Sequence, residues 1–191
     1  MSGQLILILG GARSGKSSYA ERLAPQLGDR VLYVATAEAR DEEMKARIAV
    51  HQKARPASWR TVEAPRGVGR AVEAALDDRS AGVVLLDCMT LLVSNNILAG
   101  ISEEELDHID EGGARQRVDA EVEALLAAIR ATNIPWIIVS NEVGLGLVPP
   151  YALGRIYRDL LGWANQRLAA EAERVYLMVA GLPMDLKKSS F

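Results

Sequence analysis

Two stretches of the chain combine residue types that can carry out phosphoryl chemistry. The first reads Gly10-Gly-Ala-Arg-Ser-Gly-Lys-Ser17, which is G-x-x-x-x-G-K-S after an apolar run. Glycines let the backbone curl so that its N–H groups face phosphate oxygens, and the N-terminus of the next helix adds its dipole. Lys16 would reach the β- and γ-phosphates, and Ser17 would ligate Mg²⁺. The motif predicts a nucleotide site made by Gly10, Gly11, Ala12, Arg13, Ser14, Gly15, Lys16 and Ser17.

A glycine-rich turn that matches by chance is the alternative, and the strand and helix patterns on either side disfavour it. A phosphate site of this kind also needs a carboxylate on the magnesium side. The apolar run 83–86 ends in Asp87, as a Walker-B segment requires. Asp87 could instead be an ordinary acidic helix cap. Glu142 follows another apolar run; it could act as a base or position an acceptor, or be a solvated loop carboxylate.

The second stretch, RIAVHQKARP at residues 47–56, contains one of the two histidines of the chain. Met44, Ile48 and His51 fall on one helical face, so spacing alone favours a packed core histidine. No cysteine or histidine lies at metal-ligand distance in the sequence, which argues against a zinc site. A neutral imidazole, with a pKa of about 6.5, is nevertheless a good nucleophile near neutral pH.

As a nucleophile, His51 would attack the α-phosphorus of GTP, expel pyrophosphate and form a covalent phosphoramidate. Lys53 and Arg55 would neutralise the charge that develops on the phosphates, with Arg55 suited to bidentate contact. His108 lies in an acidic segment without comparable neighbours and is predicted to be a surface residue.

The elements that must position these residues follow an alternation of short apolar runs and helical patterns. Strands are predicted at residues 5–9, 31–35, 59–62, 83–86, 136–140 and 175–180. Helices are predicted at 16–27 with Gly28 as C-cap, 41–53, 68–76, 91–98, 115–131 and 152–172, with an acidic surface excursion at 100–113. The alternation predicts one α/β domain over residues 1–191, with a mostly parallel sheet, helices on both faces and ligands at the carboxyl ends of the strands.

Composition narrows the class of protein. The 191 residues carry a net charge of -3, with 49% hydrophobic and 25% charged residues, as in an ordinary globular domain. This balance predicts no nucleic-acid partner, which would call for a basic face. The single cysteine, Cys88, excludes a disulfide within the chain. The N-terminal MSGQLILILGG lacks the features of a signal peptide, and no apolar run approaches the ~20 residues of a membrane span. A cytoplasmic protein is predicted.

Several classes of phosphate-binding protein are disfavoured by missing features. The chain has no Asn-Lys-x-Asp to read guanine as regulatory GTPases do, and residues 110–113 match D-x-x-G without a preceding apolar strand. A nucleic-acid motor would need a longer chain and a basic groove. A kinase of a small metabolite fits the size.

The order of motifs resembles the bifunctional adenosylcobinamide kinase/adenosylcobinamide-phosphate guanylyltransferase family of cobalamin biosynthesis, from about Leu5 to Lys187. The shared stretches after the glycine-rich loop are Tyr33-Val-Ala-Thr-Ala37, Asp41-Glu-Glu-Met44, residues 48–56, Trp59-Arg-Thr-Val-Glu63, Leu85-Leu-Asp-Cys-Met-Thr-Leu91, residues 140–149, Asn165-Gln-Arg-Leu168 and Val179-Ala-Gly-Leu-Pro183. The glycine-rich loop alone is common to many families, whereas the whole series in this order is specific.

The resemblance implies a RecA-like P-loop fold, homotrimers and two reactions. Adenosylcobinamide would be phosphorylated on its aminopropanol hydroxyl by ATP or GTP. GMP would then pass from GTP to adenosylcobinamide phosphate through a GMP-histidine intermediate at the position of His51, giving adenosylcobinamide-GDP and pyrophosphate. The family pattern places around the nucleotide Ala35, Thr36, Ala37, Gln52, Lys53, Ala54, Arg55, Glu63 and Asp87.

Two positions leave alternatives open. Glu63 is a candidate to accept hydrogen bonds from guanine N1–H and N2–H₂, or it is a plain surface acid at a strand end. Some family members carry Glu rather than Asp at position 87, and the shorter side chain would alter metal reach or nucleotide recognition. Two competing functions also remain: a single-activity kinase of another small alcohol, and a P-loop regulatory ATPase whose output is a conformational change. Neither would need His51.

Overall fold

The computed structural model describes residues 4–38, 42, 45, 46, 55–76, 81–102, 104, 106 and 109–188. The strands are β1 (Leu5–Gly10), β2 (Val31–Ala35), β3 (Arg60–Glu63), β4 (Val83–Asp87), β5 (Trp136–Val139), β6 (Arg174–Val179) and β7 (Leu182–Asp185). The helices are α1 (Lys16–Leu27), α3 (Val68–Ala75), α4 (Met89–Ile97), α5 (Glu111–Ala131) and α6 (Ala152–Glu171).

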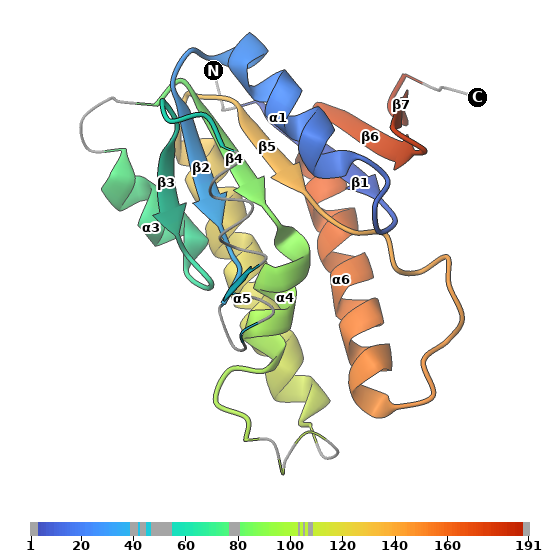
Figure 1. The fold of residues 1–191 in the computed structure, drawn as a ribbon. Coiled ribbons are helices and arrows are strands. Elements are labelled where there is room, and N and C mark those ends of the chain that lie inside the picture. Colours follow the sequence, from blue (N-terminus) through green and yellow to red (C-terminus); the bar gives the residue numbers. More distant parts are fainter. Residues whose placement is uncertain are drawn as a thin grey trace.

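All seven strands form one sheet in the order β3-β2-β4-β5-β1-β6-β7 (Figure 1). Every pairing is parallel except that of β7, which runs antiparallel to β6 at the edge of the sheet. The prediction of a mostly parallel α/β sheet is therefore confirmed. Among the described residues, no helix combines the length and apolar character that crossing a bilayer requires.

Helices cover both faces of the sheet, as predicted. Alternate residues of the central strands point to opposite faces. In β1, Ile6 and Ile8 pack with Ala20 and Ala24 of α1, while Leu5, Leu7 and Leu9 belong to the core shared with α3, α4, α5 and α6. Because both faces are covered, all six residues of β1 are buried. This explains why the strand reads as a continuous apolar run rather than an alternating one.

Most predicted elements agree with the observed ones to within one residue at each end, with four larger differences. Helices α4 and α5 begin two and four residues earlier than expected, so residues 111–113 are helical and not part of a surface excursion. Strand β7 was not predicted. Gly28 ends α1 as predicted, but in extended conformation; a Cβ there would lie 2.5 Å from the Gly82 backbone, so close approach requires the glycine. The predicted helix at 41–53 falls outside the described residues except for 42, 45 and 46, which are helical.

The connections of two neighbouring strands diverge at the carboxyl edge of the sheet. Strand β1 leads into α1 on one face, whereas its neighbour β5 leads into α6 on the other (Figure 1). Such a divergence opens a crevice outside the strand ends, and open α/β sheets bind ligands there. The fold therefore places a ligand site between the loop after β1 and the loop after β5.

A buried carboxylate holds α3 against α5. The Glu121 side chain on α5 is 9% exposed and accepts hydrogen bonds from the backbone N–H groups of Gly67 (2.8 Å) and Val68 (2.9 Å), at the start of α3. These N–H groups have no partner inside their own helix. We expect Glu121→Ala to lower the free energy of unfolding by about 2 kcal/mol, because two buried donors lose their acceptor. Urea denaturation measures this change.

Glu123→Ala, two residues along the same helix, is the matched control. The Glu123 carboxylate pairs with Arg167 on the surface, and exposed ion pairs contribute about 0–1 kcal/mol. Equal losses of stability in the two variants would contradict the role assigned to Glu121.

Candidate active site

The glycine-rich loop after β1 has a backbone that few residue types allow. Gly10 has φ +152° and Gly15 has φ +92°. A Cβ on Gly10 would lie 2.7 Å from both the Met178 carbonyl oxygen and the Ser14 Oγ, so a side chain cannot be accommodated. Arg13 also has positive φ, at 56°. The curled backbone leads directly into the N-terminus of α1, which confirms the structural setting that the motif predicted.

The side chains of this loop are arranged for an anion. Lys16 is largely buried and donates from Nζ to the Gly11 carbonyl oxygen over 2.6 Å, so its amine is held over the loop. Burial lowers the pKa of Lys16, an effect opposed by the nearby Cys88 and Asp87. The buried Ser14 Oγ has no hydrogen-bond partner among the described residues. Residues 13–18 line a cavity of about 280 Å³. A phosphate group would satisfy both the amine and the orphaned hydroxyl.

The turn between β6 and β7 supports the glycine-rich loop. This contact was not predicted from the sequence. Ala180 (φ 50°) and Gly181 (φ 84°) form a two-residue hairpin connection with both central residues at positive φ. The Gly181 N–H donates to the Ser14 carbonyl oxygen over 3.0 Å, and the Gly181 Cα would lie 3.2 Å from a Cβ on Gly15. The only sequence signal for this contact was the Ala-Gly pair inside the motif that closes the chain.

Asp87 lies at the carboxyl end of β4, in register with Ala35 of β2. The Tyr33 hydroxyl donates to Asp87 Oδ2 over 3.0 Å. Burial and then the charge of Asp87 raise the pKa of Tyr33, so the phenol stays protonated and acts as a donor. The charge of Asp87 also opposes the lowering of the Lys16 pKa by burial, as expected for a carboxylate on the same side of the sheet as the lysine amine. The strand order thus brings together two residues predicted from motifs 71 positions apart, and this supports the Walker-B interpretation of Asp87.

An arginine and a tryptophan extend the site from Tyr33 toward the β3 edge. The Arg55 guanidinium carbon lies 3.7 Å from the centroid of the Tyr33 ring, and Trp59 stacks on Tyr33 with centroids 6.2 Å apart. Arg55 Nε and Nη1 are buried without a hydrogen-bond partner among the described residues. Arg55, Trp59 and Glu63 line a cavity of about 380 Å³. Glu63 therefore opens onto a cavity that also holds a cation and an aromatic ring.

The predicted turn at Ala35-Thr36-Ala37 is anchored by a polar network. The buried Thr36 Oγ1 donates to the Cys88 carbonyl oxygen (2.7 Å) and accepts from the Cys88 N–H (2.9 Å). Asn95 Nδ2 donates to the carbonyl oxygens of Thr36 (2.8 Å) and Pro65 (3.0 Å). Because the Thr36 hydroxyl is already hydrogen-bonded to the Cys88 backbone, only backbone groups of this turn and the Ala37 side chain would be available to contact a nucleotide. Asn95 was not among the predicted site residues.

Cys88 is not a second nucleophile. Burial and the adjacent Asp87 charge raise the pKa of its thiol to about 11, so the thiolate that attack requires is scarce at neutral pH.

The segment after β5 is hydrogen-bonded to the end of β1 and to the start of α4. Glu142 donates from its backbone N–H to the Gly10 carbonyl oxygen over 3.0 Å, and its carboxylate accepts from the Gly144 N–H over 2.6 Å. The preceding Asn141 donates from its backbone N–H to the Thr90 hydroxyl over 2.8 Å. The Glu142 carboxylate thus shapes its own loop, and it also opens onto a surface cavity of about 570 Å³ with Asn165.

His51, Gln52, Lys53 and Ala54 lie outside the described residues. Of the predicted site residues that are described, the structure brings together the glycine-rich loop, Asp87 at the end of β4, and the predicted residues at the ends of β2 and β3. Among the described residues, no group of three or more histidine, cysteine and acidic side chains could hold a metal ion by itself. Any ion at this site would also need ligands from a bound nucleotide.

A family model and curated relatives match nearly the whole chain. A family model described as cobinamide kinase / cobinamide phosphate guanyltransferase matches residues 6–186. The bifunctional adenosylcobalamin biosynthesis protein CobU of Salmonella typhimurium is 42% identical over 185 residues, covering 96% of this chain and 99% of that protein. The bifunctional adenosylcobalamin biosynthesis protein CobP of Pseudomonas aeruginosa is 46% identical over 181 residues, covering 95% and 96%.

Among solved structures, the crystal structure of the RadB recombinase matches 92% of this chain and 74% of its own, with a TM-score of 0.47 and 16% identity. The family match and the curated relatives each span nearly the whole chain, and both agree with the motif series read from the sequence. The chain belongs to the cobinamide kinase / cobinamide phosphate guanyltransferase family.

Proposed function

We propose that the protein phosphorylates adenosylcobinamide with ATP or GTP and then transfers GMP from GTP to adenosylcobinamide phosphate, giving adenosylcobinamide-GDP and pyrophosphate. The observation that carries the proposal is that the glycine-rich loop and Asp87 follow strands of the same sheet at its carboxyl edge, in a chain of which residues 6–186 match the family model. Family membership supplies the acceptor and the second reaction.

In the phosphoryl transfer, backbone N–H groups of residues 10–17 and the Lys16 amine would hold the β- and γ-phosphates. The acceptor hydroxyl oxygen forms a bond to the γ-phosphorus as the bond to the β-γ bridging oxygen breaks, and the hydroxyl proton is lost. Charge spreads over the equatorial oxygens of the transferred group, so positioned cations supply most of the catalysis. Lys16 is the described cation nearest to this charge.

The donor set fits Mg²⁺, which prefers oxygen ligands and keeps waters and substrate phosphates. Ser17 Oγ and Asp87 Oδ1 would hold it, because Tyr33 occupies only Oδ2 among the described residues. When bound, Mg²⁺ neutralises phosphate charge.

In the guanylyl transfer, an imidazole nitrogen of His51 would attack the α-phosphorus of GTP. The N–P bond forms as the bond to pyrophosphate breaks. A phosphate oxygen of adenosylcobinamide phosphate then attacks the same phosphorus, and the imidazole leaves. Gln52, Lys53, Ala54 and Arg55 would contact the nucleotide, and Glu63 would accept from guanine. Arg55 has unpaired buried N–H groups that suit this contact.

Cytoplasmic location and homotrimer formation are further parts of the proposal. The first rests on the sequence features given above, and the second on the family resemblance. Light scattering on the eluted protein should give three times the 20.7 kDa chain mass. A monomer with both activities would contradict the trimer.

The direct test supplies purified protein with adenosylcobinamide, GTP and Mg²⁺, and separates the corrinoid products by chromatography. We expect adenosylcobinamide phosphate first and adenosylcobinamide-GDP later. Accumulation of adenosylcobinamide phosphate without adenosylcobinamide-GDP would indicate a single-activity kinase. Nucleotide hydrolysis without a modified corrinoid would indicate a regulatory ATPase.

Tyr33→Phe should weaken magnesium binding and should not destabilise the fold. The variant removes the donor that orients Asp87, and loss of such partners typically costs about 10- to 100-fold in metal affinity. We expect the Mg²⁺ concentration for half-maximal phosphorylation to rise by about tenfold. Tyr176→Phe, which removes a hydroxyl from β6, should leave it unchanged. An unaltered magnesium titration for Tyr33→Phe would contradict the role of Asp87 as a metal ligand.

A further inference from the structure

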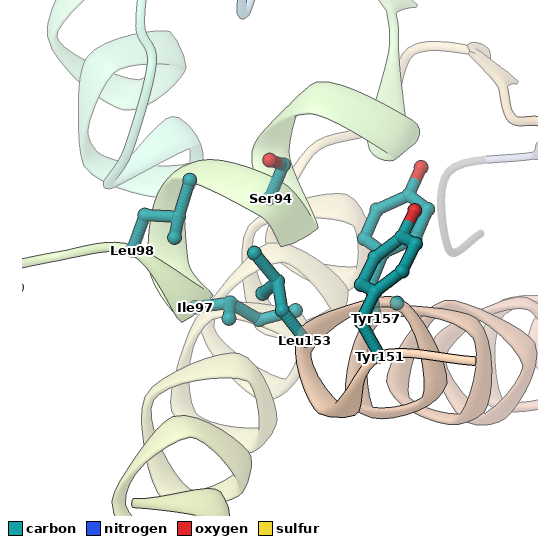
Figure 2. Close-up of a pocket in the computed structure, with 7 residues that line it drawn as sticks. Ser94, Ile97, Leu98, Tyr151, Leu153 and Tyr157 are labelled. Carbon is teal, nitrogen blue, oxygen red and sulfur yellow. The ribbon is translucent and has the colours of Figure 1, made fainter. Parts of the chain in front are cut away.

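An apolar pocket opens between α4 and the start of α6 (Figure 2). Its apolar walls are Ile97 of α4, the following residue Leu98, and Leu153 of α6, while Ser94, Tyr151 and Tyr157 supply hydroxyl groups. Figure 2 shows Ile97 at the end of α4 beside Leu153 at the start of α6, with Tyr151 and Tyr157 next to them. The pocket volume is about 220 Å³. Complete small-molecule sites usually occupy about 300–1,000 Å³, so this pocket can hold one arm of a large ligand.

The Tyr157 hydroxyl forms no hydrogen bond with the described residues. The residue is partly buried, and burial raises the pKa of its phenol, with a further contribution from Cys88. The phenol therefore stays protonated at neutral pH. The pocket thus contains a donor suited to a ligand carbonyl or hydroxyl.

Helix α4 joins the pocket to the phosphate site. Cys88, directly after Asp87, is the N-cap residue of α4, and Ser94 and Ile97 near the other end of the helix line the pocket. Helix α4 leads away from the sheet edge (Figure 1). A ligand that lies along α4 would thus have one end near Asp87 and Lys16.

The segment that leads from β5 into the pocket exposes apolar side chains. Leu145 is 87% exposed, Leu147 is 96% exposed, and Val148 and Tyr151 are each 62% exposed. Arg155 fixes the end of this segment by donating to the carbonyl oxygens of Pro149 and Pro150. Contiguous exposed apolar surface often marks a binding site, and these four residues lie within the short segment 145–151. Here they follow the strand end that borders the crevice between β1 and β5.

We propose that this pocket binds the aminopropanol arm of the cobinamide acceptor, with the Tyr157 hydroxyl donating to the amide carbonyl of the arm and the exposed segment 145–151 contacting the corrin. The arm is a short carbon chain joined through an amide, which matches apolar walls with one donor. The corrin is far larger than the pocket and would stay outside it. This inference rests on the proposed function, since that function supplies the acceptor.

The test uses Tyr157→Phe, which removes only the hydroxyl, and Ser94→Met, which fills the pocket. We expect the KM for adenosylcobinamide in the kinase reaction to rise by about five- to tenfold in Tyr157→Phe and by more than tenfold in Ser94→Met. Nucleotide KM, the melting temperature and GTP-dependent labelling of the protein should not change, because the phosphate site is untouched. Tyr176→Phe is the matched control and should match the wild type throughout.

The possible results are distinct. A raised acceptor KM with unchanged nucleotide KM supports the pocket as the acceptor site. An unchanged acceptor KM in both variants of an active enzyme overturns the inference and leaves the proposed function standing. The same holds if the variants instead alter the oligomeric mass, since the pocket would then face a second copy of the chain. A wild-type protein that does not phosphorylate adenosylcobinamide overturns the proposed function and the inference together.

Discussion

Replacing His51 by alanine is expected to abolish guanylyl transfer and to spare most of the phosphorylation. The imidazole supplies the nitrogen that bonds to the α-phosphorus, so its loss removes the covalent route altogether. Removing an enzymatic nucleophile typically costs about 10⁴- to 10⁶-fold in turnover. The measurement is the rate of GMP transfer when adenosylcobinamide phosphate is supplied with GTP, beside the rate of phosphorylation when adenosylcobinamide is supplied with ATP.

His108→Ala is the matched control, because it removes the other histidine of the chain, which is predicted to lie on the surface. It should leave both rates near those of the wild type. A folded His51→Ala protein that loses both activities equally would argue that His51 serves a shared nucleotide site. A His51→Ala protein that keeps both activities would indicate that His51 is a packing residue.

Lys16→Ala should reduce phosphorylation by about 10³-fold, the cost of losing a main electrostatic stabiliser of the transition state. The Lys16 amine is held over the glycine-rich loop and lies near Asp87, so no described lysine could replace it at the β- and γ-phosphates. The initial rate of adenosylcobinamide phosphorylation at saturating ATP measures the loss.

Lys188→Ala removes an exposed lysine near the end of the described chain and should leave the rate unchanged. Circular dichroism and thermal melting must show that Lys16→Ala is folded. A loss of less than about tenfold in the folded variant would mean that the glycine-rich loop does not hold the transferred phosphate.

Local patterns were sufficient where a residue's role follows from its immediate neighbours. The glycine-rich loop could be predicted because strand, loop and helix are consecutive in the chain. Asp87 could be predicted because an acidic residue ends an apolar strand. The core strands were predictable for the same reason: burial on both faces requires continuous apolar runs.

Contacts between distant segments could not be predicted in this way. The Tyr33–Asp87 hydrogen bond depends on β2 lying beside β4, and Tyr33 is 54 residues away in the sequence. The α4–α6 pocket depends on which face each connection takes. No single residue in it marks the pocket, because Ile97 and Leu153 read as ordinary core positions.

Two errors in the predicted elements have local causes. Strand β7 was missed because its turn places Ala180 at positive φ, a conformation that alanine rarely adopts. The start of α5 was placed too late because Gly112 and Gly113 each disfavour a helix by about 1 kcal/mol relative to alanine. Burial of Ala114 and Val118 against the core stabilises that first part of the helix.

A covalent GMP adduct on His51 is the intermediate on which the proposed guanylyl transfer depends, and a labelling experiment can detect it. The protein is mixed with Mg²⁺ and GTP labelled at the α-phosphate, denatured, and assayed for label on the chain. We expect label that is acid-labile and base-stable, as a phosphoramidate requires, and that is absent from His51→Ala and present in His108→Ala. An unlabelled chain that demonstrably binds GTP, or label that persists in His51→Ala, would contradict it.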